Sequence, residues 1–495
     1  MVEYETIIGL EVHAQLLTKS KMFCSCSADY ANAPPNTHVC PICLGMPGVL
    51  PAINKKAIEY TAMTALALNC TIAEYAKFDR KNYPYPDLMK GYQISQYDAP
   101  IGEHGWLTIN LNGSIKKIGI TRVHLEEDVA KLTHITTAAG ERYSLMDVNR
   151  AGVPLMEIVG DPDIRTPEEA RLYLMKLRTI LQYLGVSTGN MEEGSFRCDA
   201  NISIRPKGST NYMSKVEVKN MNSFRAVHRA LEYENERQRQ AVEKGEKIVQ
   251  ETRGWVEEKG ATVSQRSKEY AHDYRYFPEP DLPPLVFEKN WTEEIRARLP
   301  ELPDAMHTRF MSYYGLPKYD TDLLLDSKAM AAYFEECVKI LTIDSNGTES
   351  QRKTKLVSNW LLGDVSRMLN AVNTKIEDIK ATPELLAEML DLIEKGTISG
   401  SSAKAVFEDM FTTGKSARSI VAEKGLSQIS DDAEIESIIE QIITSNTQAV
   451  ADFQAGKQQS FTFLVGQVMK ATKGRANPSL ANKILMEKLG GNKNA

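Results

Sequence analysis

Four cysteines form two close pairs near the start of the chain. They are Cys24, Cys26, Cys40 and Cys43, a C-x-C pair followed after thirteen residues by a C-x-x-C pair. This spacing is typical of a structural zinc site with four thiolate ligands, which leaves no open position for a substrate. Two alternatives stay open: four unrelated buried thiols, and a redox C-x-x-C pair that lacks the usual strand-helix context. The zinc interpretation predicts a clamp on the loop 22–48, so any catalysis must use other residues.

Carboxylates and one imidazole recur on the polar faces of several predicted strands. In chain order they are Glu11, His13, Glu126, Glu127, Asp128, Glu157, Asp199 and Glu217, with Lys219 beside the last. Such a face ordinarily meets solvent, but Glu157 interrupts the apolar run VPLMEIVGD, where an unpaired carboxylate is costly. Oxygen ligands gathered with an imidazole suit Mg²⁺ beside a substrate phosphate, where the ion neutralises a transferring phosphoryl group. The pattern favours such a site over plain solvated strands.

The usual nucleotide-binding signatures do not accompany these carboxylates. The tripeptide GKS at 414–416 looks like the end of a P-loop, but Asp409 stands where the first glycine of that motif belongs. The segment 77–101 mixes basic and aromatic side chains, which suits phosphates and stacked bases, although an ordinary surface loop has the same composition.

The elements that must position these residues are strands and helices of the first 290 residues. In TIIGLEVHAQL, apolar and polar residues alternate, so that Glu11 and His13 face away from Leu10 and Val12. The segments DANISIRP, GITRVHLEED and SKVEVKNMN alternate in the same way. A helix is predicted in TPEEARLYLMKLRTILQYLG, with Thr166 as its N-cap and Gly185 as its stop. After the proline-rich FPEPDLPPL, nearly every segment has a helical pattern.

Length and composition limit the class of protein. A chain of 495 residues predicts two or three domains, and 42% hydrophobic with 25% charged residues is typical of a soluble globular protein. No secretory signal or membrane span is predicted, and we expect a cytoplasmic protein in which Cys70, Cys198 and Cys337 are small core residues. The net charge is −6, yet residues 451–495 hold seven basic and two acidic side chains, a local excess of +5.

Several long motifs together resemble one known family. They are IGLEVHAQL, KFDRKNYPYPDLMKGYQISQ, HLEEDVAKLTH, DVNRAGVPLMEIV, MEEGSFRCDANIS, EVKNMNSFRAVHRALEYE and HDYRYFPEPDLPPL, with FLVGQVMKATKGRANP near the end. In this order they resemble the B subunit of the bacterial aspartyl/glutamyl-tRNA(Asn/Gln) amidotransferase. The resemblance covers essentially the whole chain.

The resemblance implies an α+β fold in three parts. They are a kinase-like cradle of mixed sheet and helices at 1–292, a helical domain at 293–410 and a small all-α tail at 411–495. It also implies a heterotrimer with an amidase, the A subunit, and a small C subunit. The expected activity is that of a ligase forming carbon-nitrogen bonds with glutamine as amido donor. ATP phosphorylates the side-chain carboxylate of Glu-tRNA(Gln) or Asp-tRNA(Asn), and ammonia from the partner then displaces phosphate.

Matched motifs carry residue roles over to this chain. The resemblance implies a Mg²⁺ and phosphate site made of Glu11, His13, Glu127, Glu157 and Asp199. Glu126 is almost as good a candidate for this site as its neighbour Glu127. Strand geometry sends the two side chains to opposite faces, so only one of them faces the metal. Lys77, Lys81 and Lys219 are candidates for ATP phosphate contacts, and the four cysteines for structural zinc. Lys470, Lys473 and Arg475 are candidates for contact with tRNA phosphates, against the alternative of a solvated helical face.

Two other functions fit parts of the pattern. A stand-alone ATP-dependent ligase or kinase acting on a small acid would work without tRNA. A non-catalytic, zinc-dependent RNA-binding protein would have no use for several carboxylates, which repel RNA. The resemblance favours the tRNA-dependent amidotransferase over both.

Overall fold

The structure is a computed structural model that describes residues 2–211, 213–267, 274–342, 347–427, 432–472, 476 and 478–490. The chain divides into two compact units, residues 1–303 and 304–495. The first unit mixes strands and helices and the second is helical, which confirms the predicted α+β class with a helical C-terminal region. The three-part division with boundaries at 292 and 410 stays a prediction.

A nine-stranded sheet forms the centre of the first unit, in the order β14-β13-β12-β11-β1-β10-β7-β6-β2. Neighbouring strands are antiparallel except for the parallel pair β12 and β13, so the sheet is mixed. The strands in chain order are β1 Tyr4–Gln15, β2 Thr71–Ile72, β6 Gly102–Leu111, β7 Ser114–Glu127, β10 Pro154–Gly160, β11 Phe196–Pro206, β12 Val216–Lys219, β13 Glu251–Val256 and β14 Ala261–Ser267.

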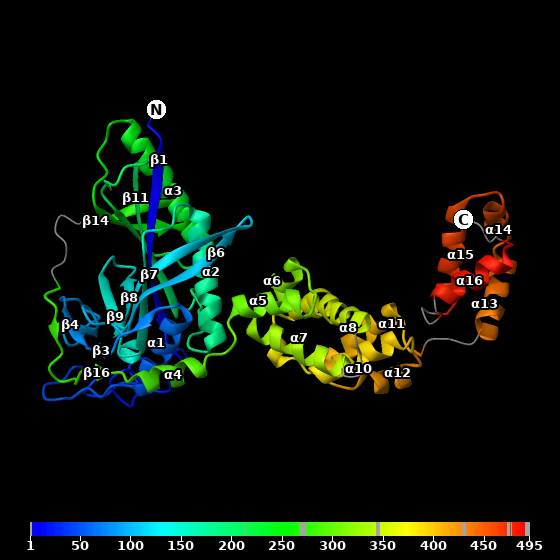
Figure 1. The fold of residues 1–495 in the computed structure, drawn as a ribbon, viewed down its shortest axis with the longest axis horizontal. Helices are drawn as coiled ribbons and strands as arrows, with labels where there is room; N and C mark the ends of the chain where they lie inside the picture. Colours follow the sequence, from blue (N-terminus) through cyan, green and yellow to red (C-terminus); the bar gives the residue numbers. More distant parts are fainter. Residues whose placement is uncertain are drawn as a thin grey trace. The chain divides into compact units, whose positions relative to one another are not determined.

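Helices cover the apolar face of this sheet. They are α1 (Lys55–Ala67), α2 (Pro167–Leu184) and α3 (Phe224–Glu243), and Figure 1 shows α2 and α3 running along the sheet. The side chains of Leu10 and Val12 from β1 are buried against them, as the alternating pattern predicted. The α2 termini are also as predicted. Thr166 accepts a hydrogen bond from the Glu169 amide, and Gly185 ends the helix with a φ of 70°.

Short strands border the large sheet. A three-stranded sheet contains β15 (Phe277–Pro278), β4 (Asp79–Asn82) and β5 (Tyr92–Ser95), while β16 (Leu285–Val286) pairs with β3 (Tyr75–Ala76). The hairpin of β8 (Lys131–Thr136) and β9 (Arg142–Asp147) follows β7. The proline-rich segment therefore contributes only two-residue edge pairings, in keeping with its prolines. Helix α4 (Lys289–Ala297) then buries Ile295 in the core of the first unit.

The second unit consists of helices in its described residues. The helices are α5 Pro303–Ser312, α6 Lys318–Leu325, α7 Lys328–Leu341, α8 Gly347–Trp360, α9 Ser366–Val372, α10 Pro383–Glu394, α11 Gly400–Thr413, α12 Ala417–Lys424, α13 Asp432–Ser445, α14 Thr447–Gln454, α15 Gln458–Ala471 and α16 Pro478–Lys488. The last four share a small core of their own, which includes Ile435, Leu464 and Leu485. In the described part of the chain, no helix is long and apolar enough to cross a membrane.

Candidate functional site

The polar face of the large sheet lies opposite the helices, and strand register decides which side chains meet there. On β1, Glu11 and His13 point away from the helical layer, as the alternation of the strand requires. His13 lies opposite Glu157 of β10, and Glu11 lies opposite Asp199 of β11. Because directly opposed residues share a face, three neighbouring strands bring these polar residues onto one face of the sheet.

Three side chains converge closely enough to hold a metal ion. His13, Glu126 and Glu157 each offer a ligand atom, and these atoms all lie within 4.8 Å of one another. The Nε2 atom of His13 is 3.6 Å from Glu126 Oε1 and 3.4 Å from Glu157 Oε2. Both carboxylates are buried. One imidazole and two carboxylates are a suitable ligand set for a divalent cation such as Mg²⁺ or Mn²⁺.

Histidines compensate the buried charge of Glu157. Burial alone would raise the pKa of Glu157, but His124 and His13 hold this pKa well below its usual value. Burial likewise opposes protonation of His13, yet Glu157 and then Glu126 raise the pKa of its imidazole. For Glu11, burial and the charges of Glu157 and Asp199 act together and raise the pKa. The site therefore concentrates negative charge that a bound cation would relieve.

Glu126 and Glu127 point to different surroundings. Ser95 donates a hydrogen bond of 3.1 Å to Glu126, which faces His13. The carboxylate of Glu127 instead binds the Lys90 ammonium and accepts a hydrogen bond of 2.9 Å from the Ile94 amide. The structure therefore brings Glu126, and not Glu127, together with His13 and Glu157. Alternation along β7 sends neighbouring side chains to opposite faces.

Glu11, Asp199 and Lys219 occupy the next part of the polar face. Asn201 donates a hydrogen bond of 2.8 Å to Glu11, and Lys219 donates one of 2.6 Å to Asp199. The Lys219 ammonium also lies 3.4 Å from Glu217. A groove of about 430 Å³ begins at Glu11 and Asn201, and the apolar residues Ile7 and Val159 also line it.

The other two predicted lysines have different environments. Lys81 projects among aromatic rings, with its ammonium 5.0 Å from the Tyr274 ring centre and 5.9 Å from that of Tyr83. Burial opposes the charge of Lys81, but Glu126 is the main group that raises its pKa, with Glu157 adding to this effect. Lys77 instead binds Asp79 and Asp98. The described ion-pair partners of Lys77 are therefore these two aspartates, and not Glu126 or Glu157.

Sequence reasoning missed one histidine and one arginine at this site. His124 is 2% exposed, and its Nε2 atom lies 3.2 Å from Glu157 Oε2. His124 precedes Glu126 by two residues on one strand, so the two side chains share a face. The sequence could have revealed His124 by this spacing. Arg197 lies opposite His13 in the sheet register and donates a hydrogen bond of 3.1 Å to buried Asp128. Arg197 thus adds a positive charge beside the acidic group.

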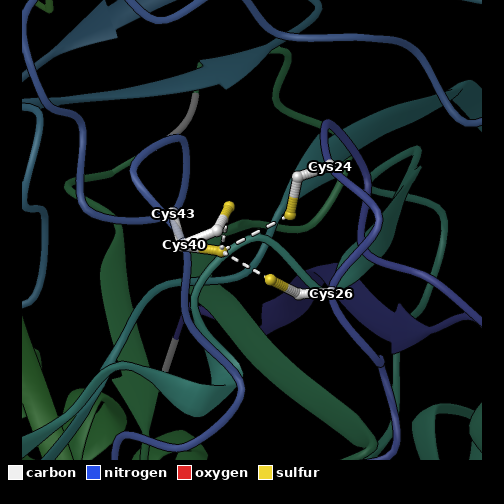
Figure 2. A group of neighbouring side chains, drawn as sticks. All are labelled: Cys24, Cys26, Cys40 and Cys43. Carbon is white, nitrogen blue, oxygen red and sulfur yellow. Dashed lines mark hydrogen bonds between the residues drawn. The ribbon is translucent and has the colours of Figure 1, made fainter.

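The four paired cysteines lie together, and their sulfur atoms point toward one common space (Figure 2). The sulfur atom of Cys43 lies 3.4 Å from Cys24, 3.7 Å from Cys40 and 3.8 Å from Cys26. Sulfur atoms about 2.3 Å from a tetrahedral zinc ion would be about 3.8 Å apart, so this group fits zinc. By contrast, Cys70, Cys198 and Cys337 are isolated and buried, as predicted.

Of the three residues predicted to contact tRNA, the structure describes Lys470. Lys470 is exposed in the last turn of α15. Lys473 and Arg475 lie outside the described residues.

Comparison with known proteins identifies the family. A family model described as the GatB/GatE catalytic domain matches residues 6–293, and one described as the GatB domain matches residues 344–489. The chain belongs to the GatB/GatE family. This result confirms the resemblance inferred from the sequence motifs.

Full-length relatives of this family are similar to the chain throughout. Three proteins named as the B subunit of aspartyl/glutamyl-tRNA(Asn/Gln) amidotransferase serve as examples. The protein of Dehalococcoides mccartyi is 58% identical over 491 residues, which is 99% of both chains. That of Carboxydothermus hydrogenoformans is 54% identical over 489 residues, again 99% of both. That of Thermodesulfovibrio yellowstonii is 54% identical over 486 residues, 98% of this chain and 99% of the relative.

The two neighbouring glutamates allow a matched test of the cation site. We expect Glu126→Gln to weaken Mn²⁺ binding at least about tenfold, because it removes a ligand charge. Glu127→Gln should leave Mn²⁺ affinity nearly unchanged and lower the free energy of unfolding by about 2 kcal/mol, because the half-buried Lys90 ammonium loses its counter-charge. Electron paramagnetic resonance of free Mn²⁺ and urea unfolding measure the two effects. Equal loss of Mn²⁺ affinity in both variants would contradict this placement.

Metal analysis tests the cysteine site. We expect about one zinc ion per purified chain and a lower melting temperature after chelation, because a structural zinc site contributes directly to folding. Cys40→Ser should lose the zinc, whereas Cys337→Ser, a buried cysteine outside the group, should retain it. Mass spectrometry of the metal content and thermal unfolding provide the readouts. Equal zinc content in the two variants would exclude the four-cysteine site.

Proposed function

We propose that this chain is the component of a tRNA-dependent amidotransferase that activates the misattached amino acid. Its substrates would be Glu-tRNA(Gln) or Asp-tRNA(Asn), and its class that of the ligases that form carbon-nitrogen bonds with glutamine as donor. The convergence of His13, Glu126 and Glu157 on one face of the sheet carries this proposal. The family membership and the names of the full-length relatives support it. We expect this work to take place in the cytoplasm.

The chemistry requires an activated carboxylate because oxide is a poor leaving group. An oxygen of the side-chain carboxylate attacks the γ-phosphorus of ATP, and ADP leaves with the electrons of the broken bond. Ammonia then forms a bond to the acyl carbon, and phosphate leaves to give the amide. A Mg²⁺ ion held by His13, Glu126 and Glu157 would supply charge stabilisation for the phosphoryl group. The kinase-like cradle proposed for residues 1–292 would enclose these steps.

The surrounding residues have distinct tasks in this proposal. The Lys81 ammonium interacts electrostatically with Glu126 and Glu157, and it would offer positive charge to a transferring phosphoryl group. Arg197 supplies a second positive group, fixed in place by Asp128. The partly apolar groove of about 430 Å³ beside Glu11 has the volume to hold a nucleoside next to these carboxylates. ATP would then lie along the polar face with its phosphates toward His13.

Partners complete the proposed reaction. An amidase, the A subunit, would release ammonia from glutamine, and a small C subunit would complete a heterotrimer. The acidic face repels nucleic acid, so tRNA binding needs basic residues elsewhere. We propose that the α13–α16 bundle at 432–490 supplies such a surface through Lys470 and Lys483, which are both exposed.

Replacing Glu157 tests the phosphoryl-transfer step. Glu157→Gln should reduce ATP hydrolysis that depends on misacylated tRNA by at least about a thousandfold, since it removes a charged ligand of the Mg²⁺ ion that would stabilise the reacting phosphate. Binding of tRNA should change less than about twofold, because the lysines proposed to contact the tRNA phosphates lie in the C-terminal helices. Glu236→Gln, an exposed glutamate on α3, is the control and should retain activity. Phosphate release and a filter-binding assay measure these quantities; full activity of Glu157→Gln would remove the assignment.

Charge reversal tests the tail. Lys470→Glu combined with Lys483→Glu should weaken tRNA binding and lower the slope of log affinity against log salt by about 2. Glutaminase activity in the partner should stay unchanged. Lys247→Glu, a reversal of an exposed lysine in the first unit, is the control. Deletion of 432–495, which removes the whole helical core of the tail, should have a larger effect. An unchanged salt slope would show that the tail does not contact tRNA.

A further inference from the structure

A lysine is buried beside the four cysteines. Lys21 is 1% exposed, and its ammonium donates a hydrogen bond of 2.7 Å to the His38 carbonyl. It also lies 3.4 Å from the Val148 carbonyl and 3.4 Å from the sulfur atom of Cys43. The backbone holds this lysine in place, because its amide donates to the Cys26 carbonyl at 2.9 Å. The Lys21 side chain therefore ends beside the four paired cysteines.

The charge of Lys21 requires a negative partner. A lysine is almost never fully buried unless it is paired, because a desolvated ammonium costs several kcal/mol. In the part of the chain that the structure describes, no carboxylate forms an ion pair with Lys21. The two carbonyl groups offer only dipoles. Among its described contacts, the sulfur atom of Cys43 is the only one that can carry a full negative charge.

The state of the cysteines decides whether this partner exists. Four protonated thiols carry no charge, and neither does a disulfide between Cys40 and Cys43. Both leave the Lys21 ammonium uncompensated. A zinc ion with four thiolates has a net charge of −2, since four negative sulfurs exceed the two positive charges of the ion. A zinc–thiolate centre therefore supplies the buried ammonium with the negative partner that four neutral thiols or a disulfide would lack.

We propose that Lys21 is the charge-balancing residue of a zinc–thiolate centre, donating a hydrogen bond to the Cys43 ligand. Outer-shell donors of this kind orient and stabilise metal ligands. The residue acts through Cys43 and is a positioning residue, not a catalytic one. The proposal rests on the zinc site and is independent of the phosphoryl-transfer chemistry. Its tests use metal binding and chemical labelling, without tRNA or ATP.

Zinc release from the full chain provides the first test. Lys21→Met keeps the length of the side chain and removes its charge, and it should release zinc to a chromophoric chelator at least about tenfold faster than the wild type. Lys19→Met is the matched control, because Lys19 lies two residues away and is exposed. Its release rate should equal that of the wild type. An unchanged rate in Lys21→Met would overturn the proposal.

A double-mutant cycle separates charge from packing. Cys26→His keeps a zinc ligand but lowers the negative charge of the centre from −2 to −1. If Lys21 acts by charge, Lys21→Met should accelerate zinc release less in the Cys26→His background than in the native one. An equal acceleration in both backgrounds would show that Lys21 acts by packing and would overturn the charge-balancing role.

Labelling of the wild-type chain covers the case in which Lys21→Met does not fold. With zinc bound, Lys21 should resist acetylation, whereas exposed Lys19 should react. After chelation under reducing conditions zinc no longer fixes the loop 22–48 around Lys21, and the acetylation of Lys21 should increase severalfold relative to that of Lys19. Peptide mass spectrometry measures both sites. Equal protection of Lys21 with and without zinc would contradict the proposal.

Discussion

The contact between His13 of β1 and Glu157 of β10 is the interaction around which the polar face is organised. It exists because the two residues lie directly opposite each other in the antiparallel register of two central strands. A shift of one residue would turn Glu157 into the helical layer and Met156 out of it. The apolar residues on the other face, such as Val12 and Ile158, prevent that shift because they are packed beneath the helices. The hydrophobic core thus fixes the position of the polar site.

Buried charges in the first unit are each paired in a specific way. Glu157 is paired with two histidines, Asp128 with Arg197, and Glu127 with Lys90. Such pairs stabilise a fold only weakly, but removal of one partner leaves a desolvated charge that is strongly destabilising. Lys21 follows the same rule only if the neighbouring cysteines carry negative charge. The first unit therefore holds several charges in place at low net cost, which is what a preorganised site for charged substrates requires.

The two units divide the physical tasks of the proposed function. The first unit collects carboxylates on one face of a sheet, which suits a cation and a phosphorylated intermediate but repels the phosphates of tRNA. The second unit is helical in its described residues and ends in a bundle with exposed lysines on α15 and α16. Separate surfaces for chemistry and for RNA avoid the conflict between these charges. The two family models likewise match different units, residues 6–293 in the first and residues 344–489 in the second.

The sequence by itself determined the features that depend on local spacing. The alternation in β1 and β11, the caps of α2 at Thr166 and Gly185, and the pairing of the four cysteines were all readable, because each depends on residues a few positions apart. Its long motifs also identified the family. Only the tertiary structure decided that Glu126 faces His13 while Glu127 binds Lys90, that Asp79 and Asp98 hold Lys77, and that Lys21 is buried at the cysteines. These outcomes depend on strand register and on contacts between distant segments, which no local periodicity encodes.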